Sequence, residues 1–180
     1  MFAPRAVARH VRLLRSNPKY FRARLRVLLY QQLHPHSPWL TADAIGLLQR
    51  YLKPSMRGFE WGSGRSSTTH FAFSACRDGL KRANITSVDY RLLPTRPENL
   101  YVSAIQDFPD EHFDFILIDG QCREECLAAA VPKLKRDGLV VLDNADAGYQ
   151  EPADAALTRM STDNGIWRTD ILTKRRLTLS

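Results

Sequence analysis

The sequence has few cysteines and lacks a long apolar run. Its 180 residues contain only three cysteines, Cys76, Cys122 and Cys126. Such an odd and sparse set is not a disulfide framework and suits a reducing compartment, so we expect a cytoplasmic protein. No stretch of about 18 uncharged apolar residues occurs, which excludes a transmembrane helix. Apolar residues make up 44% and charged residues 25% of the chain, a composition that indicates a globular fold.

Acidic residues are absent from the first 36 positions, which hold eight Arg or Lys residues. The other 144 residues hold 18 basic and 19 acidic residues, so the net charge of +7 divides into +8 and −1. We therefore expect a basic helical N-terminal extension over 1–36, with helices at 5–16 and 19–33, and one domain over 37–180. Three uses of the extension stay open: a flap packed on the domain, a contact with an acidic partner or an anionic membrane surface, or an organelle presequence.

Strand patterns alternate with helix patterns after residue 40, which predicts an α/β domain. Thr41 is placed to cap a helix over 42–52. The predicted strands are 57–61, 85–89, 100–104, 113–118, 138–143, 166–172 and 176–180, and the other predicted helices are 66–78, 122–135 and 151–161. The apolar runs at 113–118 and 138–143 indicate buried parallel strands, and the last two strands predict a hairpin. The expected fold is a single Rossmann-like domain with a mostly parallel, seven-stranded sheet.

The first predicted strand ends in a glycine-rich loop, Glu60-Trp61-Gly62-Ser63-Gly64. Two glycines one residue apart let the backbone turn tightly and approach a ligand closely. The helix expected after the loop directs its free amide groups toward that ligand. The second predicted strand ends in Asp89, whose carboxylate can accept hydrogen bonds from both hydroxyls of a ribose, although a solvated strand-end aspartate fits this position equally well.

Two later strands also end in polar side chains. Asp119-Gly120 follows 113–118, and Asp143-Asn144 follows 138–143. Since the carboxyl ends of parallel strands meet at one edge of a sheet, we expect these groups close together. They can contact a ligand, handle a proton or bind a hard metal ion, or they can cap the loops that follow.

The segments FEWGSGRSS, SVDY and FDFILIDGQCREECLAAAVPKLKRDGLVVLDNAD, in this order, resemble class I S-adenosylmethionine-dependent methyltransferases. The resemblance covers roughly 40–180 and is most specific over 113–146. The cofactor-binding residues that it implies are Glu60, Gly62, Ser63, Gly64, Asp89 and Asp119. The glycine loop would hold the methionine end of S-adenosylmethionine (SAM), and Asp89 would bind the ribose. Asp119 would lie beside the sulfonium and the acceptor as the catalytic residue.

The resemblance implies transfer of a methyl group from SAM to an acceptor, and we expect an oxygen on a small or sugar-like molecule. In the cation-dependent O-methyltransferases of this class, matching residues bind a divalent ion. Asp119, Asp143 and Asn144 are therefore candidate ligands for Mg²⁺ or another oxygen-preferring cation. The lysine that usually follows the first aspartate in those enzymes is missing, and Arg123 is the nearest basic residue. Metal-free relatives carry the same acidic positions, so a metal-free site is the alternative.

Two other functions stay open. Only ten residues, 90–99, separate the second and third predicted strands, where the family usually has a helix. A site left incomplete there would suit a shortened, inactive fold that serves as a binding or scaffold module. A NAD-binding oxidoreductase could use the same glycine loop, but Ser67 occupies the place of the third fingerprint glycine. The sequence indicates neither the identity of the acceptor nor the oligomeric state.

Overall fold

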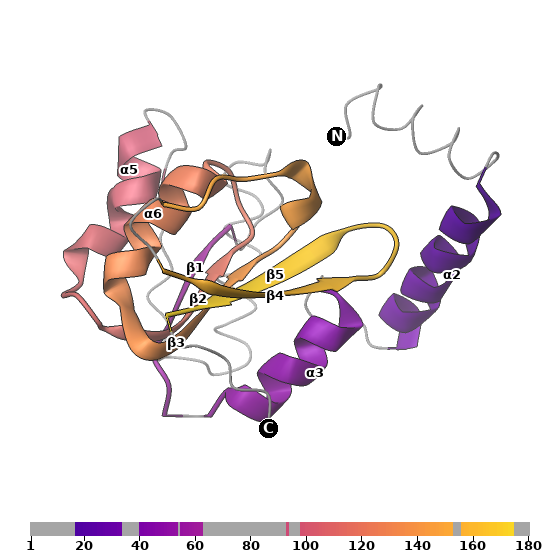
Figure 1. Ribbon diagram of the computed structural model, residues 1–180, viewed down its shortest axis with the longest axis horizontal. Helices are drawn as coiled ribbons and strands as arrows, with labels where there is room; N and C mark the ends of the chain where they lie inside the picture. The colour runs from indigo at the N-terminus through magenta and orange to yellow at the C-terminus, as the bar shows by residue number, and fades with distance from the viewer. Residues whose placement is uncertain are drawn as a thin grey trace.

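Figure 1 shows a computed structural model of the protein, which describes residues 17–33, 40–53, 55–62, 93, 98–152 and 156–174. In chain order the elements are α2 (Pro18–Leu33), α3 (Ala42–Tyr51), β1 (Gly58–Trp61), α5 (Glu98–Val102), η1 (Ser103–Asp107), β2 (Phe113–Ile118), α6 (Arg123–Lys133), β3 (Leu134–Leu142), η2 (Ala145–Ala147), β4 (Thr158–Asp163) and β5 (Arg168–Thr173). The helices predicted over 5–16 and 66–78 and the strands predicted over 85–89 and 176–180 lie outside the described residues.

The described strands form one mixed, five-stranded sheet in the order β1-β2-β3-β5-β4. β1 pairs parallel with β2, and β2 pairs parallel with β3. β5 then runs antiparallel to β3, and β4 completes an antiparallel hairpin with β5. The predicted α/β class, parallel core and C-terminal hairpin are therefore confirmed, with five strands rather than seven in the part of the chain that is described.

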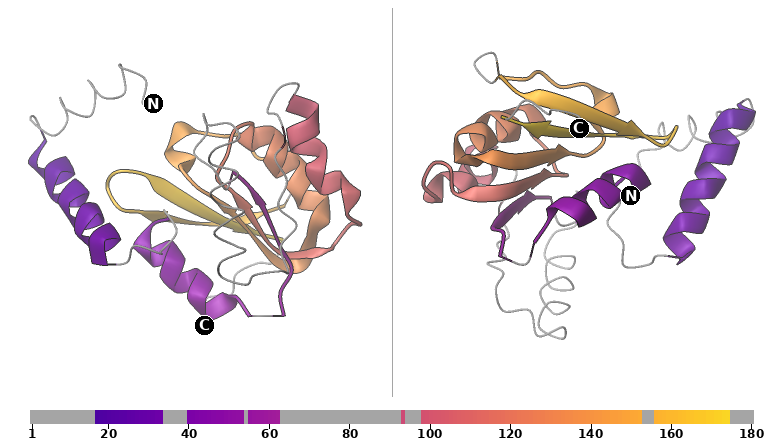
Figure 2. Two further views of the ribbon diagram at one scale, coloured as in Figure 1. Left: turned by 180° about the vertical axis from the view of Figure 1, so that it is seen from behind. Right: turned by 60° about the horizontal axis from the view of Figure 1, so that its bottom comes forward.

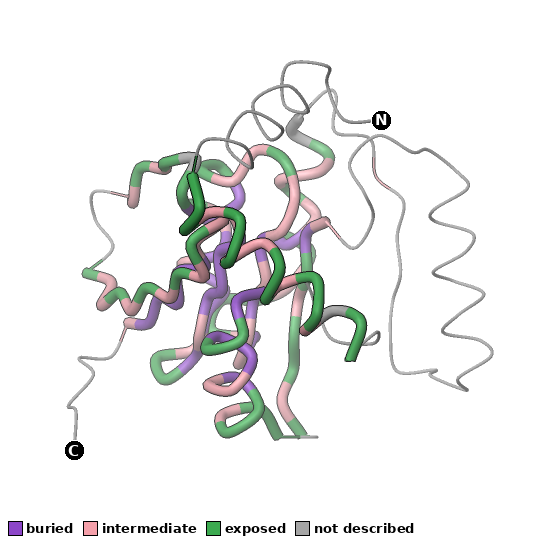
Figure 3. Tube along the Cα trace, turned by 90° about the vertical axis from the view of Figure 1, so that its right-hand side faces the viewer, coloured by how far each residue is buried: buried purple, intermediate pink, exposed green. Residues whose placement is uncertain are grey.

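Helices cover both faces of the sheet (Figures 1 and 2). Successive residues of β3 point to opposite faces, so Val140 and Leu142 pack with Leu127 of α6, whereas Val141 packs with Ile45 of α3. These side chains are buried, and Figure 3 shows the buried residues concentrated along the strands and on the helix sides that face them. Each such side chain stabilises the fold by about 1.5–3 kcal/mol relative to an exposed position.

The segment predicted as a strand over 100–104 is helical, so this prediction is wrong. It forms α5 and η1. The side chains of this segment that pack onto the core are those of Tyr101, Val102, Ile105 and Phe108, and their spacing of one, three and three residues matches one face of a helix. Alternation along a strand would have put the neighbours Tyr101 and Val102 on opposite faces, whereas both pack onto the same core cluster.

The C-terminal hairpin forms earlier in the chain than predicted. The helix predicted over 151–161 is wrong, because β4 begins at Thr158 and alternates half-buried and exposed residues without a helical stripe. β5 takes the place of the strand predicted over 166–172. The turn between them uses Asn164, whose Oδ1 accepts hydrogen bonds from the N–H groups of Ile166 and Trp167, and Gly165, which has a φ of +81°.

The helix predicted over 122–135 ends two residues early. α6 ends at Lys133, directly after Pro132, and β3 begins at Leu134. The pairing of β3 with β2 shifts register between Phe113 and Phe115 and becomes regular only from Leu139 onward. The regular part of β3 therefore coincides with the strand predicted over 138–143, and it delivers Asp143 to the carboxyl edge of the sheet.

Candidate active site

The carboxyl ends of β1, β2 and β3 lie side by side. Trp61 pairs with Ile118, and Ile118 pairs with Leu142, as the last residues of their strands. Backbone hydrogen bonds extend this register by one residue. The N–H of Asp119 donates to the carbonyl of Trp61 at 2.9 Å, and the N–H of Asp143 donates to the carbonyl of Ile118 at 3.0 Å. The residues that follow the three strands therefore meet at one edge of the sheet.

Gly62 permits the closest approach of two chain segments at this edge. Its φ of +107° is a conformation that residues with a side chain rarely adopt. A Cβ atom built on it would lie 2.5 Å from the carbonyl carbon of Asp119 and 2.7 Å from the N of Gly120. A Cβ atom on Gly120 would in turn lie 3.3 Å from the Cα of Gly62. Only bare backbone at these two positions lets the ends of β1 and β2 pass this closely.

Tyr101 closes over this pair of glycines from α5. A Cβ atom on Gly120 would lie 3.2 Å from the Cζ of Tyr101. Nε1 of Trp61 donates a hydrogen bond to the carbonyl of Tyr101 at 2.9 Å, which fixes α5 to the end of β1. Burial raises the pKa of Tyr101 far above its ordinary value, so the phenol stays protonated at neutral pH. Tyr101 was not predicted as a site residue from the sequence. The available signal was its spacing of four residues from Ile105, which is typical of one face of a helix.

Charged side chains gather around Asp119. Burial raises the pKa of Asp119 to about 6, with a further rise from Glu60 and an opposing effect from Arg123. Burial also raises the pKa of Asp143 to about 6, although the Thr169 hydroxyl and the Arg123 charge lower it and the Asp119 charge raises it. Desolvation raises the pKa of Glu60, even though part of its surface reaches solvent. Asp119 and Asp143 thus share the field of the Arg123 guanidinium, and Glu60 adds a third carboxyl group near Asp119, so the edge holds more negative than positive groups, which favours a cationic ligand.

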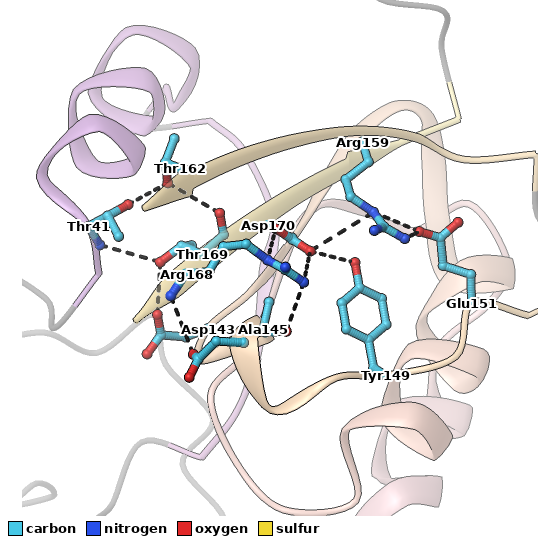
Figure 4. Close-up of polar contacts among 11 residues, drawn as sticks. Thr41, Asp143, Ala145, Tyr149, Glu151, Arg159, Thr162, Arg168, Thr169 and Asp170 are labelled. Carbon is cyan, nitrogen blue, oxygen red and sulfur yellow. Dashed lines mark hydrogen bonds and ion pairs between the residues drawn. The ribbon is translucent and has the colours of Figure 1, made fainter. Parts of the chain in front are cut away.

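Asp143 is engaged in packing the C-terminal hairpin (Figure 4). Its Oδ1 accepts a hydrogen bond from the Thr169 hydroxyl at 2.9 Å, and that hydroxyl accepts one from the N–H of Thr41 at 3.3 Å. The Thr41 hydroxyl, which caps α3, also contacts the hydroxyl of Thr162. Thr162 in turn donates to the carbonyl of Thr169 at 3.2 Å. One polar chain therefore joins the start of α3, the hairpin and the end of β3.

Asp170 anchors the hairpin to the loop after β3 (Figure 4). Its fully buried carboxylate lies 3.0 Å from Nε of Arg168 and accepts a hydrogen bond from the hydroxyl of Tyr149 at 2.9 Å. Nη2 of Arg168 also donates to the carbonyl of Ala145 at 2.8 Å. Because a buried carboxylate requires such partners, this network holds the loop that carries Asn144 beside the site. This network was not predicted from the sequence. Its available signal was the pair of opposite charges, Arg168 and Asp170, two residues apart in an otherwise buried strand.

The described residues give no support to a metal ion held by Asp119, Asp143 and Asn144. One oxygen of Asp143 is engaged by Thr169, and Asn144 has left-handed backbone with a φ of 51°. Within the described ranges, no group of three or more His, Cys, Asp or Glu side chains is arranged to hold a metal ion. The metal predicted from the sequence is therefore unsupported, and no step of the chemistry below passes through one.

The same edge fits SAM in two respects. Gly62 and Gly120 bring the ends of β1 and β2 together at the carboxyl edge of the sheet, where open α/β sheets bind their ligands. The excess of carboxylates suits the positive sulfonium of SAM and disfavours the pyrophosphate of NAD. Ser63, Gly64 and Asp89, three of the predicted cofactor-binding residues, lie outside the described residues. The structure brings Glu60, Gly62 and Asp119 to one edge, and their roles toward the cofactor stay predictions.

Comparison with known proteins gives structural matches alone. No protein-family model and no curated protein sequence matches the chain. The O-methyltransferase from Bacillus cereus in complex with SAH is similar, with a TM-score of 0.51 and 16% identity over 92% of this chain and 96% of that chain. A protein from Corynebacterium glutamicum has a TM-score of 0.50 and 15% identity over 97% of this chain and 100% of its own. A SAM-dependent methyltransferase from Aquifex aeolicus has a TM-score of 0.47 and 11% identity over 72% of this chain and 88% of that chain.

At such identities the likeness concerns the fold. The shared architecture includes the parallel core β1-β2-β3 and the antiparallel hairpin that follows it. This agreement confirms the resemblance found in the sequence. The chain has the fold of S-adenosylmethionine-dependent methyltransferases.

Proposed function

We propose that the protein transfers a methyl group from SAM to an oxygen of a small or sugar-like acceptor. The observation that carries the proposal is the close approach at Gly62, where bare backbone meets the main chain of Asp119 amid an excess of carboxylates. The likeness to an O-methyltransferase fold supports the choice of oxygen. The proposed cofactor-binding residues are Glu60, Gly62, Ser63, Gly64, Asp89 and Asp119. The sparse cysteines favour the cytoplasm as the compartment.

SAM supplies an already activated methyl group, so the protein has mainly to align donor and acceptor and to exclude water. In the proposal, Gly62 and Gly120 let the ends of β1 and β2 meet beside the ligand, and Tyr101 shields the site from the side of α5. Asp119 acts as the base that accepts the proton of the acceptor hydroxyl. With a pKa of about 6 it is mostly ionised at neutral pH, and the positive charge of Arg123 helps to keep it so.

Titration calorimetry of the full chain with SAM, with SAH and with NAD tests the proposed cofactor. We expect heat from SAM and SAH and none from NAD at the same concentrations. The variant Asp119→Asn should bind SAM more weakly, because it removes one of the negative charges that face the sulfonium. Tighter binding of NAD than of SAM would favour the oxidoreductase, and no binding of any of the three at millimolar concentration would favour the scaffold module.

Transfer of a labelled methyl group tests the proposed reaction. The full chain and labelled SAM are incubated with sugars, catechols and other vicinal diols, and in parallel with amines and thiols of similar size. We expect label on oxygen, at a rate unchanged by a chelator. Label on nitrogen or sulfur alone would contradict the proposed acceptor, and loss of turnover with the chelator would show that a metal takes part.

A further inference from the structure

The helix α2 has a well-defined start. Asn17 caps it, because its Oδ1 accepts hydrogen bonds from the N–H of Lys19 at 3.1 Å and from that of Tyr20 at 3.2 Å. Pro18 occupies the first helical position, where its missing N–H costs nothing. Over its 16 residues the helix carries four basic residues and no acidic one, namely Lys19, Arg22, Arg24 and Arg26.

One side of α2 touches the rest of the molecule. The half-buried residues are Tyr20, Ala23, Arg24, Val27 and Tyr30, which recur at the helical period. A Cβ atom on Gly165, in the turn of the hairpin, would lie 3.1 Å from the Cβ of Ala23, and Tyr30 packs against the buried cluster that contains Ile45. In Figures 1 and 2, α2 accordingly lies at the periphery, with the hairpin turn directed toward it.

The opposite side of α2 is apolar and exposed. Its large apolar residues are Phe21, Leu25, Leu28, Leu29 and Leu33, and they keep between 44% and 76% of their surface exposed. Phe21, Leu25, Leu28 and Leu29 follow one another at helical spacings of three or four residues, Leu29 coming four after Leu25, so these four form a continuous stripe. At 100° per residue this stripe lies about half a turn away from the side that carries Ala23 and Tyr30. A flat surface could therefore meet the stripe without displacing the body of the protein.

The exposed arginines of α2 border this stripe. Arg22 and Arg26 are exposed and lie on the flank of the helix next to Leu29. Exposed leucine and phenylalanine with arginine beside them suit a membrane interface, where apolar side chains enter the acyl boundary and arginine meets the lipid phosphates. The first 36 residues add to the attraction, since they hold eight basic residues and no acidic one. A second copy of the chain is a poor partner for the stripe, because it would bring the same cations together with no acid on α2 to offset them.

We propose that α2 docks the protein on an anionic lipid surface, with the stripe Phe21-Leu25-Leu28-Leu29 in the acyl boundary and Arg22 and Arg26 at the phosphate level. None of the helices in the described part of the chain is long and apolar enough to cross a bilayer. Binding is therefore peripheral, and it needs both the apolar stripe and the negative lipid charge. The docking does not depend on whether the domain binds SAM.

Sedimentation of the full chain with lipid vesicles tests this docking. Vesicles of phosphatidylcholine alone are compared with vesicles that contain about 30% phosphatidylserine, the anionic lipid of cytoplasmic leaflets. We expect binding to the anionic vesicles only, and weakening when salt rises from about 0.1 M to about 0.5 M, since the screening length then falls from about 10 Å to about 4 Å. Each basic residue at a membrane surface strengthens binding about fivefold, so the double variant Arg22→Gln, Arg26→Gln should bind about 25-fold more weakly.

Matched variants separate docking from general changes in charge or polarity. Arg50→Gln with Lys53→Gln removes two exposed cations at the end of α3 and should leave vesicle binding within about twofold. Leu25→Gln with Leu28→Gln should reduce binding at least about tenfold, whereas Leu52→Gln, at another exposed leucine, should not reduce it. Circular dichroism of every variant confirms that the fold is retained.

Five results would overturn the proposal, and the first four concern the vesicles and the oligomeric state. They are equal binding to neutral and anionic vesicles, no binding to either, an equal loss with the α3 control variants, and a dimer in vesicle-free sedimentation that the Leu25 and Leu28 changes dissociate. The fourth result would assign the stripe to a second copy of the chain. A soluble polyanion that binds as tightly as the vesicles, and without need of the leucines, would assign the arginines to an acidic partner instead.

Discussion

Replacing Gly62 with alanine should destabilise the protein and weaken SAM binding together. Alanine at a φ of +107° costs about 1–3 kcal/mol in backbone strain. Its Cβ would also lie 2.5 Å from the carbonyl carbon of Asp119, so the ends of β1 and β2 must separate. That movement breaks the hydrogen bond from the N–H of Asp119 to the carbonyl of Trp61, which contributes about 1 kcal/mol. We expect a loss of about 2–4 kcal/mol in the free energy of unfolding.

Gly46 provides the matched control for this change. It lies within α3, and a Cβ atom built on it meets nothing within 4 Å. Gly46→Ala should therefore stabilise the protein by about 0.5–1 kcal/mol, because alanine is the better helix former. Urea denaturation followed by circular dichroism measures both variants, and calorimetry gives their SAM affinities. A Gly62→Ala protein that unfolds within about 0.5 kcal/mol of wild type and binds SAM equally well would refute the close approach at this edge.

Three further changes test the site and its support. Burial raises the pKa of Asp119 to about 6 in the folded protein, so its ionisation lowers the stability progressively between about pH 4, near the pKa of the unfolded chain, and about pH 6, and the loss is complete above that. Asp119→Asn should therefore abolish methyl transfer yet raise the free energy of unfolding by about 1–2 kcal/mol at pH 8 and leave it unchanged at pH 3, and an equal effect at both pH values would contradict this. Thr169→Val removes the side-chain hydroxyl that donates to buried Asp143 and should cost about 1–3 kcal/mol in urea denaturation, against no loss for exposed Ser161→Ala. Leu127→Ala should lower the same free energy by about 2–5 kcal/mol through a cavity beneath α6, and a loss below about 1 kcal/mol would mean that the core there is loosely packed.

Strong local signals explain which elements the sequence predicted. The apolar runs at 113–118 and 138–143 have the composition of strands buried on both faces, and they form β2 and the regular part of β3. Thr41 before an amphipathic run is a helix start, and its hydroxyl does accept the hydrogen bond from the N–H of Ala44. Parallel pairing then carries Asp119 and Asp143 to one edge, so their juxtaposition follows once the two strands are assigned.

Weak or overlooked signals explain the errors. Residues 100–104 have an apolar start that fits a strand, and only the contacts of Tyr101 and Ile105 with α6 and β1 select the helix. The polar segment from Thr158 forms a strand because its partner β5 supplies the hydrogen bonds. The local residue preferences of this segment do not predict that pairing. The dipeptide Asn164-Gly165 is typical of a hairpin turn, and this signal was overlooked. The engagement of Asp143 by Thr169 joins residues 26 positions apart and depends on the hairpin, so the pattern of strand-end acids alone suggested a metal.

Ultraviolet cross-linking of radiolabelled SAM to the full chain tests the central claim most directly, because it locates the cofactor. The account predicts label on the tryptic peptide 58–65, which carries Glu60 and Gly62, or on the peptide that ends at Arg123 and carries Asp119. Unlabelled SAH should compete the label away, and Gly62→Ala should reduce it where Gly46→Ala does not. Label confined to peptides of α2 or of the hairpin, or label that SAH leaves in place, would contradict a SAM site at the carboxyl edge of β1 and β2.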